Sequence, residues 1–372
     1  MTLGSLFDGI GGWLLAARHA GVTLVWASEI EPFPCSVTAR HFPDVKQLGD
    51  ITQIDPDGIA PVDIVCAGSP CQDLSIAGKR KGLCGERSGL FRTAVELVRG
   101  MRIRTGGRYP RFFVWENVPG AFSSNRGMDF QAVLEEIGES KIPMPQGNRW
   151  AAAGLVQCPG AEIAWRVLDA QHWGVPQRRR RIFLVADFAA DDRRAGEILF
   201  ECEGVSGNIA ESKGTGEGTA TETEGGARAT DKYGIVSAGF IAGNKNGGIG
   251  YKTEQAATIK AQWGGQAPTV AIYDMTHADE GVRPVKDGIV PTLNARMGTG
   301  GNHGGGSENL AVTRSIVRRL TPTECERLQG LEDGYTEGGS DTARYKALGN
   351  GMAQPCADYV IRRIVECAKE VR

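Results

Sequence analysis

The sequence predicts an α/β protein built on a mostly parallel sheet, with a smaller β-rich domain near its C-terminus. From residue 3 to about residue 188, short apolar runs alternate with stretches that have helical spacing. Buried-type strands that alternate with helices are typical of a parallel sheet covered on both faces. A length of 372 residues with 41% hydrophobic residues is enough for two domains.

The expected elements follow from these apolar runs and from local start and stop signals. Strands are expected at 3–7, 23–28, 62–67, 111–116 and 181–187, with a short third strand before Gly49, and helices at 11–20, 32–41, 88–102 and 128–137. Thr321-Pro322-Thr323-Glu324 has the order of a capping box, so a helix should begin there and run to about Gln329. A last helix is expected at 354–369, and residues 138–160 are interpreted as a surface insertion.

The composition changes near residue 203. Residues 201–232 are almost all Gly, Ser, Thr, Glu and Ala, which cannot form a core, so they are predicted to be a flexible linker or insertion. Residues 233–330 would form the β-rich domain, in which 257–264 and 291–298 resemble each other as a weak repeat. Residues 331–372 would return to the first domain, residues 1–200.

Charge and cysteine usage restrict the partners and the compartment. A net charge of −2 gives no global positive field, so a polyanion would have to bind local basic patches. Nine cysteines without a C-x-x-C pair give neither a zinc spacing nor a disulfide framework, so no metal site is expected. No apolar run approaches the roughly 20 residues that span a bilayer. A reducing cytoplasm is the expected compartment.

Cys71 is the candidate nucleophile. It lies in Gly68-Ser69-Pro70-Cys71-Gln72, directly after the predicted strand 62–67. Proline restricts the backbone there, so the thiol would sit on a rigid loop beyond the sheet, where a thiolate can react. A cysteine after a strand is, by itself, more often part of the core, so the other motifs must decide.

A glycine-rich loop, Phe7-Asp8-Gly9-Ile10-Gly11-Gly12, joins the first strand to the first helix. Such a loop could bind a dinucleotide, a nucleotide or S-adenosylmethionine, or merely turn; it lacks the full spacing for a pyrophosphate. Glu29 ends the second strand and Asp50 follows the third, where acids can accept bonds from ribose hydroxyls. Together Phe7, Glu29 and Asp50 fit an adenosine-bearing ligand, although solvated loop carboxylates remain the alternative.

Two further motifs carry charge beside predicted strands. Trp115-Glu116-Asn117-Val118-Pro119 places a carboxyl at a strand end, where it could hydrogen-bond a base ring. Gln177-Arg178-Arg179-Arg180-Arg181 precedes another strand, and arginine suits the recognition of phosphates and carbonyls. Strand alternation would aim Arg179 and Arg181 the same way. A capping carboxylate and a solvated basic loop are the respective alternatives.

In this order the motifs resemble the DNA (cytosine-5) methyltransferases of bacterial and phage type. The matching segments are Phe7-x-Gly9-x-Gly11-Gly12, Glu29, Gly49-Asp50-Ile51, Gly68-x-Pro70-Cys71-Gln72, Glu116-Asn117-Val118, Gln177-x-Arg179-x-Arg181, Arg319-Leu320-Thr321-x-x-Glu324-x-x-Arg327-Leu328-Gln329-Gly330 and Gly349-Asn350-Gly351. The resemblance covers about 1–190 and 313–372. It implies a Rossmann-like S-adenosylmethionine-dependent methyltransferase sheet and a β-rich target-recognition domain. One departure is Ser5, where many members carry an acid.

The resemblance also implies roles for individual residues. Phe7 would stack on the adenine of S-adenosyl-L-methionine, Glu29 would bind its ribose and Asp50 its adenine amino group. The same cofactor site would include Gly9, Gly11, Gly12, Ile30, Ile51 and Asn350. Cys71 would attack C6 of a flipped-out cytosine, Glu116 would contact N3 and the exocyclic amine, and Arg179 would bind the base carbonyl. Pro70, Gln72, Asn117 and Arg181 would complete the catalytic site.

The implied partner is double-stranded DNA, and the implied enzyme is a site-specific DNA (cytosine-5-)-methyltransferase. A cognate restriction endonuclease is a candidate partner, no membrane is involved, and the chain is expected to be a monomer. Three alternatives remain at this stage: cytosine methylation of tRNA on the same scaffold, a catalytically silent DNA-binding protein, and an NAD-dependent oxidoreductase, which fits the motifs least well.

Overall fold

The computed structural model describes residues 1–69, 89–200 and 320–369, together with short strands between residues 241 and 319. The chain forms two compact units. Unit 1 comprises Met1–Leu168, Arg180–Val205 and Cys356–Arg372, and unit 2 comprises Asp169–Arg179 and Ser206–Pro355. The predicted linker 201–232, the repeat at 257–264 and 291–298, and the loop Pro70-Cys71-Gln72 lie outside the described residues.

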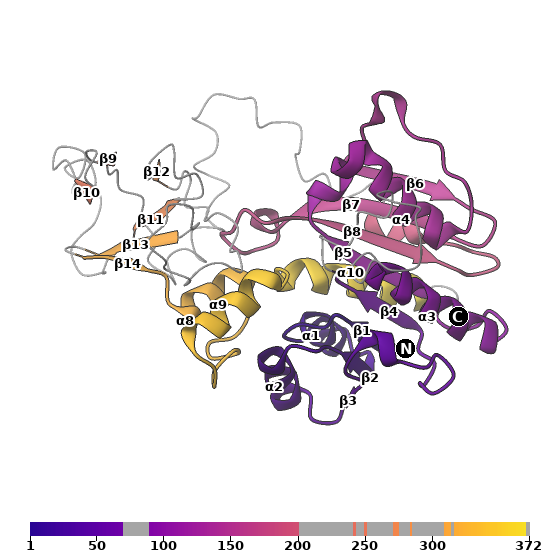
Figure 1. Ribbon diagram of the computed structural model, residues 1–372, viewed down its shortest axis with the longest axis horizontal. Coiled ribbons are helices and arrows are strands. Elements are labelled where there is room, and N and C mark those ends of the chain that lie inside the picture. Colours follow the sequence, from indigo (N-terminus) through magenta and orange to yellow (C-terminus); the bar gives the residue numbers. More distant parts are fainter. Residues whose placement is uncertain are drawn as a thin grey trace. The chain divides into compact units, whose positions relative to one another are not determined.

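Unit 1 is built on one eight-stranded sheet (Figure 1). Its strands are β1 Thr2–Leu6, β2 Thr23–Ser28, β3 Lys46–Gln47, β4 Ile64–Ala67, β5 Phe112–Asn117, β6 Ala153–Gln157, β7 Glu162–Asp169 and β8 Arg180–Asp187, in the order β3-β2-β1-β4-β5-β8-β7-β6. Neighbours from β3 to β5 are parallel, whereas the β5–β8 and β6–β7 pairs are antiparallel. The parallel half therefore brings the ends of β1 to β5 to one edge.

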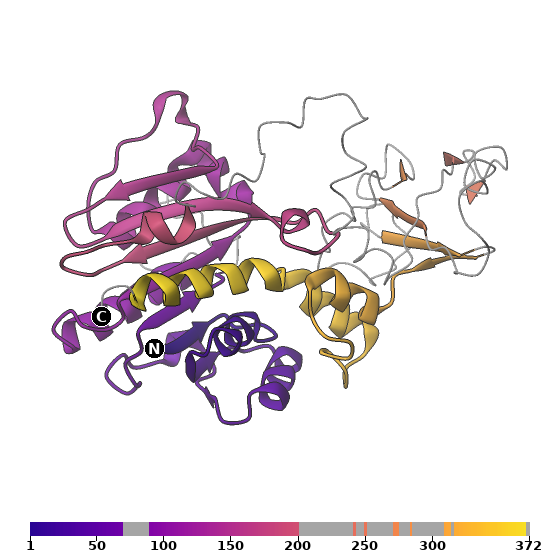
Figure 2. The ribbon, with the colours of Figure 1, turned by 180° about the vertical axis from the view of Figure 1, so that it is seen from behind.

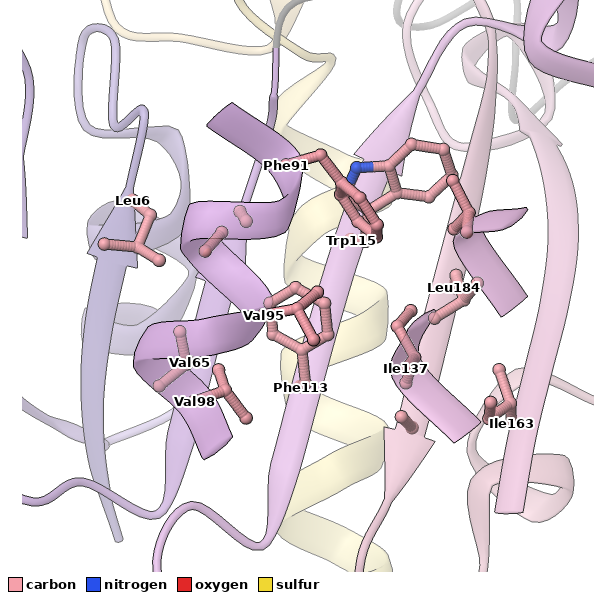
Figure 3. Packing of buried hydrophobic residues seen from close by; sticks show 14 of the residues in the cluster. Leu6, Val65, Phe91, Val95, Val98, Phe113, Trp115, Ile137, Ile163 and Leu184 are labelled. Atoms are coloured by element: carbon pink, nitrogen blue, oxygen red, sulfur yellow. The ribbon is translucent and has the colours of Figure 1, made fainter. Parts of the chain in front are cut away.

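Helices cover both faces of this sheet. They are α1 Gly12–His19, α2 Pro32–His41, α3 Leu90–Arg104, α4 Met128–Gly138, α5 Ala195–Leu199 and α10 Gln354–Lys369. Figure 3 shows α3 and the buried side chains of β1, β4, β5 and β8 packed on one face, with α10 behind the sheet. Trp13 of α1 meets Phe183 of β8 edge-on, and His19 of α1 bonds Asp358 of α10 at 3.1 Å, so α1 and α10 share the opposite face (Figure 2).

The core explains why the strands read as continuous apolar runs. All four residues of β4 are buried, and successive side chains serve opposite faces: Val65 and Ala67 join the cluster beneath α3, while Ile64 and Cys66 do not. Burying apolar side chains contributes about 25 cal/mol per Å² of buried surface. Because these short strands are buried on both faces, they are stable with few backbone hydrogen bonds to their neighbours. Gly4 of β1 is required by packing, because a Cβ there would lie 2.2 Å from the Trp26 ring.

The described residues of unit 2 include a four-stranded antiparallel sheet, a separate two-stranded pair, and helices α8 and α9. Its strands are β9 Ile241–Ala242, β10 Ile249–Gly250, β11 Ala271–Asp274, β12 Arg283–Pro284, β13 Asn309–Thr313 and β14 Ile316–Arg319, and β11 to β14 form one sheet in the order β12-β11-β13-β14. The helices are α8 Pro322–Gln329 and α9 Asp341–Asn350. The expected capping box is present at α8, where Glu324 N donates to Thr321 Oγ1 at 3.2 Å and Thr321 N donates to Glu324 at 2.7 Å.

Most expected elements are present, but one expectation needs correction and some elements were not expected. The segment 138–160, interpreted as a surface insertion, contains β6, which joins the sheet as its edge strand. Strand β7 and helices α5 and α9 were not anticipated at all. Cys356–Arg372 belongs to unit 1, and Asp169–Arg179 groups with unit 2, while the domain bounds expected from the sequence remain predictions. Short 3₁₀ turns complete the described chain at Ile51–Gln53, Pro119–Phe122, Ser124–Gly127, Gln146–Asn148 and Ala170–His172.

Candidate active site

The loop after β1 has the backbone of a ligand-binding turn. Phe7 has φ of 54°, a left-handed conformation that non-glycine residues rarely adopt, and Gly9 and Gly11 have φ of 56° and 85°. Strain of this kind persists where the surrounding structure over-determines it, commonly at functional sites. A Cβ on Gly9 would meet no atom within 4 Å, so the backbone there faces open space. The loop can therefore accept a ligand against its main chain.

Glu29 ties this loop to the end of β2. Its Oε2 accepts a hydrogen bond from Gly9 N at 2.8 Å, and its Oε1 accepts from Ile30 N at 2.8 Å and Glu31 N at 2.9 Å. Oε2 has one lone pair left for a ribose hydroxyl. Ile30 beside it is 68% exposed, an unusual state for a large apolar side chain, and it offers an apolar wall.

Asp50 and Ile51, in the loop after β3, have different surroundings: the carboxylate is exposed and the apolar side chain is buried. Asp50 is exposed, and its Oδ1 accepts from Thr52 N at 2.9 Å, which fixes the carboxyl at the start of a 3₁₀ turn. Gly49 has φ of 71° and open space above its Cα. Ile51 is 4% exposed and packs in the core, so its side chain anchors the loop and offers a ligand little surface.

Asp8 is the unusual group of this edge. Its side chain is 5% exposed, and the neighbouring Ser5 hydroxyl is the group that favours its ionised form. Burial raises the pKa of Asp8 to about 7, the nearby Glu29 charge adds to that, and the Ser5 hydroxyl opposes it only in part. The carboxyl is therefore half protonated near neutral pH.

This burial makes a stability prediction. The unfolded carboxyl ionises near pH 3.8 and the folded one near 7, so the folded state binds more protons in between and stability falls as pH rises from about 4 to 7. Roughly three pH units at about 1.4 kcal/mol each put the penalty at up to about 4 kcal/mol above pH 7. In denaturant titrations, Asp8→Asn should gain stability over wild type progressively across that window. A difference in the free energy of unfolding between Asp8→Asn and wild type that stays constant with pH would contradict this prediction.

The ends of β4 and β5 form a second group of polar residues. Glu116 Oε1 and Arg181 Nε lie 3.0 Å apart, with side chains 13% and 15% exposed. The antiparallel register pairs Glu116 with Phe183, so Arg181, two residues before Phe183, lies diagonally from Glu116 on the same face of the sheet. A Cβ on Gly68, after β4, would lie 3.6 Å from Glu116 Oε2. The loop that leads to Cys71 thus begins beside this ion pair.

Two side chains of β5 hold the start of the Cys71 loop. Trp115 Nε1 donates to Ser69 Oγ at 3.0 Å, and Asn117 Nδ2 donates to Ser69 O at 2.9 Å. Asn117 Oδ1 in turn accepts from Val118 N at 2.8 Å. The Trp115 ring is fully buried and packs edge-on against Phe91 with centroids 5.7 Å apart (Figure 3). Ser69 is thereby fixed two residues before the candidate nucleophile, a link that the sequence motifs do not reveal.

Arg179 lies in different surroundings from Arg181. Its side chain is 1% exposed, and its Nη2 donates to the carbonyl oxygens of Gly349, at 2.9 Å, and of Gly351. Strand β8 begins at Arg180, so the alternation expected for both arginines does not extend to Arg179. The guanidinium expected to bind the base carbonyl therefore serves the backbone of unit 2, and Arg181 is the arginine beside Glu116. Gln177 is fully buried, and none of the described residues forms a hydrogen bond with its side-chain amide.

Asn350, expected in the cofactor site, is the last residue of α9 in unit 2 and is exposed between the two glycines whose carbonyls bond Arg179. Among the described residues, no group of three or more His, Cys, Asp or Glu side chains could hold a metal ion. None of the helices in that part of the chain is long and apolar enough to cross a membrane.

Comparison with known proteins identifies the family. Residues 1–366 match the model of the C-5 cytosine-specific DNA methylases. The chain belongs to this family. The chain is 26% identical over 384 residues to the Type II methyltransferase M.HpaII of Haemophilus parainfluenzae, covering 98% of the chain and 89% of the relative. Its fold resembles the S. pombe Dnmt2 methyltransferase with a TM-score of 0.58 at 15% identity, covering 100% and 99% of the two chains.

One relative of the chain carries a different name. A DNA N-6-adenine-methyltransferase of Escherichia phage P1 is 30% identical over 463 residues, which cover 98% of this chain and 61% of that protein. The chain thus spans about three fifths of that relative. The family and the α/β fold class expected from the sequence are confirmed.

Proposed function

We propose that the protein is a DNA cytosine-5 methyltransferase that uses S-adenosyl-L-methionine and forms a covalent adduct through Cys71. The observation that carries the proposal is the Glu116–Arg181 pair at the exit of β5, 3.0 Å apart and beside the first residues of the Cys71 loop. A second support is the edge formed by Phe7, Glu29 and Asp50, whose geometry suits an adenosine. Catalysis needs both groups because the methyl must pass from one to the other.

In the proposed reaction the Cys71 thiolate adds to C6 of an extruded cytosine, which turns C5 into a carbon nucleophile. The bound cofactor supplies an electrophilic methyl group on a sulfonium. Attack by C5 breaks the methyl–sulfur bond, and the electron pair stays on sulfur. Loss of the C5 proton to a base then expels Cys71 as thiolate and restores the aromatic ring. All atoms balance without a metal or a redox partner.

Glu116 and Arg181 would stabilise the charge that develops on the ring. A carboxylate can accept a hydrogen bond from the exocyclic amine and hold a proton at N3, while the planar guanidinium donates to the C2 carbonyl. We assign to Arg181 the carbonyl contact that the sequence motif suggested for Arg179, since Arg179 already donates to Gly349 and Gly351. Asn117 and Trp115 would act through Ser69, by holding the loop of the nucleophile.

The test is methyl transfer from labelled S-adenosyl-L-methionine to duplex DNA of mixed sequence, followed by nucleoside analysis. Label in 5-methylcytosine is expected, and Cys71→Ala should reduce it to background, whereas Cys158→Ala, a buried thiol beyond β6, should retain it. DNA with 5-fluorocytosine should become linked to wild type only. Label in N6-methyladenine would instead favour the activity named for the phage P1 relative. Label only in tRNA, or none at all, would also overturn the proposal.

The remaining expectations about partners stay predictions. The cytoplasmic location, a monomeric state and a cognate restriction endonuclease rest on the sequence and on the family. Residues 233–330 are proposed to form the target-recognition domain, which bisulfite sequencing of DNA from expressing cells would link to a recognition site.

A further inference from the structure

Three exposed arginines of unit 1 have no partner inside the protein. Arg126, Arg149 and Arg180 form no side-chain hydrogen bond, ion pair or ring contact with the described residues. Other arginines of this unit donate to carbonyl oxygens or carboxylates of the chain itself, as do Arg99, Arg102, Arg104, Arg111, Arg166 and Arg193. The three guanidinium groups therefore keep all their N–H donors for an external acceptor.

All three arginines lie at the end of the sheet that carries the Glu116–Arg181 pair. Arg180 is the first residue of β8, and Arg126 lies in the 3₁₀ turns between β5 and α4. Arg149 precedes β6, which starts at this end because it runs antiparallel to β7, and β7 ends where β8 begins. Three segments of the chain thus bring unpaired positive charge to one end of the sheet.

The same arginines also share one face of the sheet. Strand alternation puts Arg180 on the side of Ile182, which joins the apolar cluster of α3 and α4. The turn of Arg126 leads directly into α4, and Trp150, the neighbour of Arg149, packs against the same cluster. We call Arg126, Arg149 and Arg180 the arginine row.

Two turns that contact each other carry Arg126 and Arg149. Arg126 has φ of 57°, a conformation that non-glycine residues rarely adopt. Trp150 Nε1 donates to Gly127 O at 2.8 Å, and a Cβ on Gly127 would lie 3.1 Å from Asn148 O. A backbone fixed in this way presents both arginines to a ligand at a low cost in conformational entropy.

The size and the charge of the arginine row fit a phosphate backbone. The strands β5, β8, β7 and β6 are neighbours in this order, so three spacings of about 4.8 Å make this part of the sheet roughly 14 Å wide (Figure 1). One strand of B-DNA carries a phosphate every 3.4 Å of helix axis, so that width corresponds to roughly four nucleotides. Because the net charge of the chain is −2, a polyanion depends on such a local patch.

We propose that the arginine row binds successive phosphates of one strand of the substrate DNA, beside the Glu116–Arg181 pair that acts on the base. This inference rests on the proposed function, which makes DNA the substrate. Each planar guanidinium forms charge-assisted hydrogen bonds with phosphate oxygens. Phosphate contacts fix the position of the duplex and carry no sequence information, so the row strengthens binding to all sequences alike.

The test is the salt dependence of binding of the full chain to a fluorescent duplex of mixed sequence, measured by anisotropy from about 50 to 200 mM salt. The slope of log K against log salt should fall in magnitude by about 1 for each Arg→Gln change and by about 3 for the triple variant of the arginine row. The KM for DNA should rise, while kcat at saturating DNA and the Kd for S-adenosyl-L-methionine stay near wild type.

Matched variants separate lost charge from other effects. Arg108→Gln removes an exposed arginine that stacks on Tyr109 at the opposite end of the sheet, and it should keep the wild-type slope. Arg→Lys changes in the arginine row keep the charge and should retain most of the slope. A triple Arg→Gln variant with the slope of Arg108→Gln would overturn the proposal. So would a loss confined to one DNA sequence, or a fall in kcat without a rise in KM.

A measurement on wild type avoids reliance on variants. Duplex DNA should protect Arg126, Arg149 and Arg180 from modification by phenylglyoxal, read by mass spectrometry, and should leave Arg108 reactive. Equal modification of the row with and without DNA would contradict the assignment. Wild type that binds no duplex DNA, or that binds tRNA more tightly, would refute the proposed function itself. Wild type that methylates DNA, with a triple variant that binds DNA equally well, would refute only the role of the arginine row.

Discussion

Glu116→Gln is expected to slow methyl transfer by about 10²- to 10⁴-fold, the range for loss of a positioned acid–base group. The amide cannot carry the proton of the ring nitrogen, and it loses the charge that pairs with Arg181 at 3.0 Å. Because the interaction strengthens as the adduct forms, kcat should fall while the Kd for S-adenosyl-L-methionine stays near that of wild type. Single-turnover transfer and cofactor titration measure the two quantities separately.

Arg181→Lys sharpens this experiment. It keeps one positive charge but cannot present two coplanar N–H groups, so it should fall between wild type and Glu116→Gln. Glu135→Gln on α4 removes a partly exposed carboxylate that pairs with Lys141, a neighbour in sequence, and it serves as the matched control with unchanged rate. A Glu116→Gln rate within threefold of that control would exclude the role proposed for the carboxylate.

Arg344→Met is expected to destabilise unit 2 by about 3–5 kcal/mol, the usual consequence of leaving one member of a buried ion pair alone. Glu326 is fully buried and accepts bonds from Gly334 N and Thr336 N, both at 2.8 Å, and from Arg344 at 2.9 Å. These bonds join α8 to the turn before α9 and to α9 itself. Denaturant unfolding, with amide exchange over residues 320–350, would measure the loss.

The matched control for Arg344 lies on α8. Arg327 pairs with Asp333 across the same turn, but the two side chains are 37% and 55% exposed. Exposed pairs contribute about 0–1 kcal/mol, so Arg327→Met should change stability by no more than that. If Arg344→Met and Arg327→Met lost equal free energy of unfolding, burial would not explain the stability that the Glu326 hydrogen bonds contribute.

The parallel half of the sheet could be predicted because its strands carry a strong local signal. Runs such as Ile64–Ala67 are apolar throughout, glycine turns follow them, and the helices between begin at visible signals such as Pro32. The site motifs were equally local, since Glu29, Asp50 and Glu116 each sit at a strand end. Parallel order then brings those ends to one edge without further information.

The remainder depended on contacts between residues far apart in sequence. Strand β6 alternates exposed and half-buried residues as an edge strand does, which resembles a loop when its partner β7 is unknown. Helix α9 has little amphipathic character, and the N-cap residue Ser340 is its main sequence signal. The separation of Arg179 from Arg181 was invisible, because it depends on carbonyls 170 and 172 residues away.

The position of Arg179 also limits how the proposed recognition region could be exchanged between related enzymes. Its unit includes Asp169–Arg179, a short excursion between β7 and β8 that is remote in sequence from Ser206–Pro355. A chimera that transplants only the longer segment would leave a foreign loop facing the carbonyls of Gly349 and Gly351. Engineered hybrids with altered sequence specificity should therefore inherit both segments from one parent.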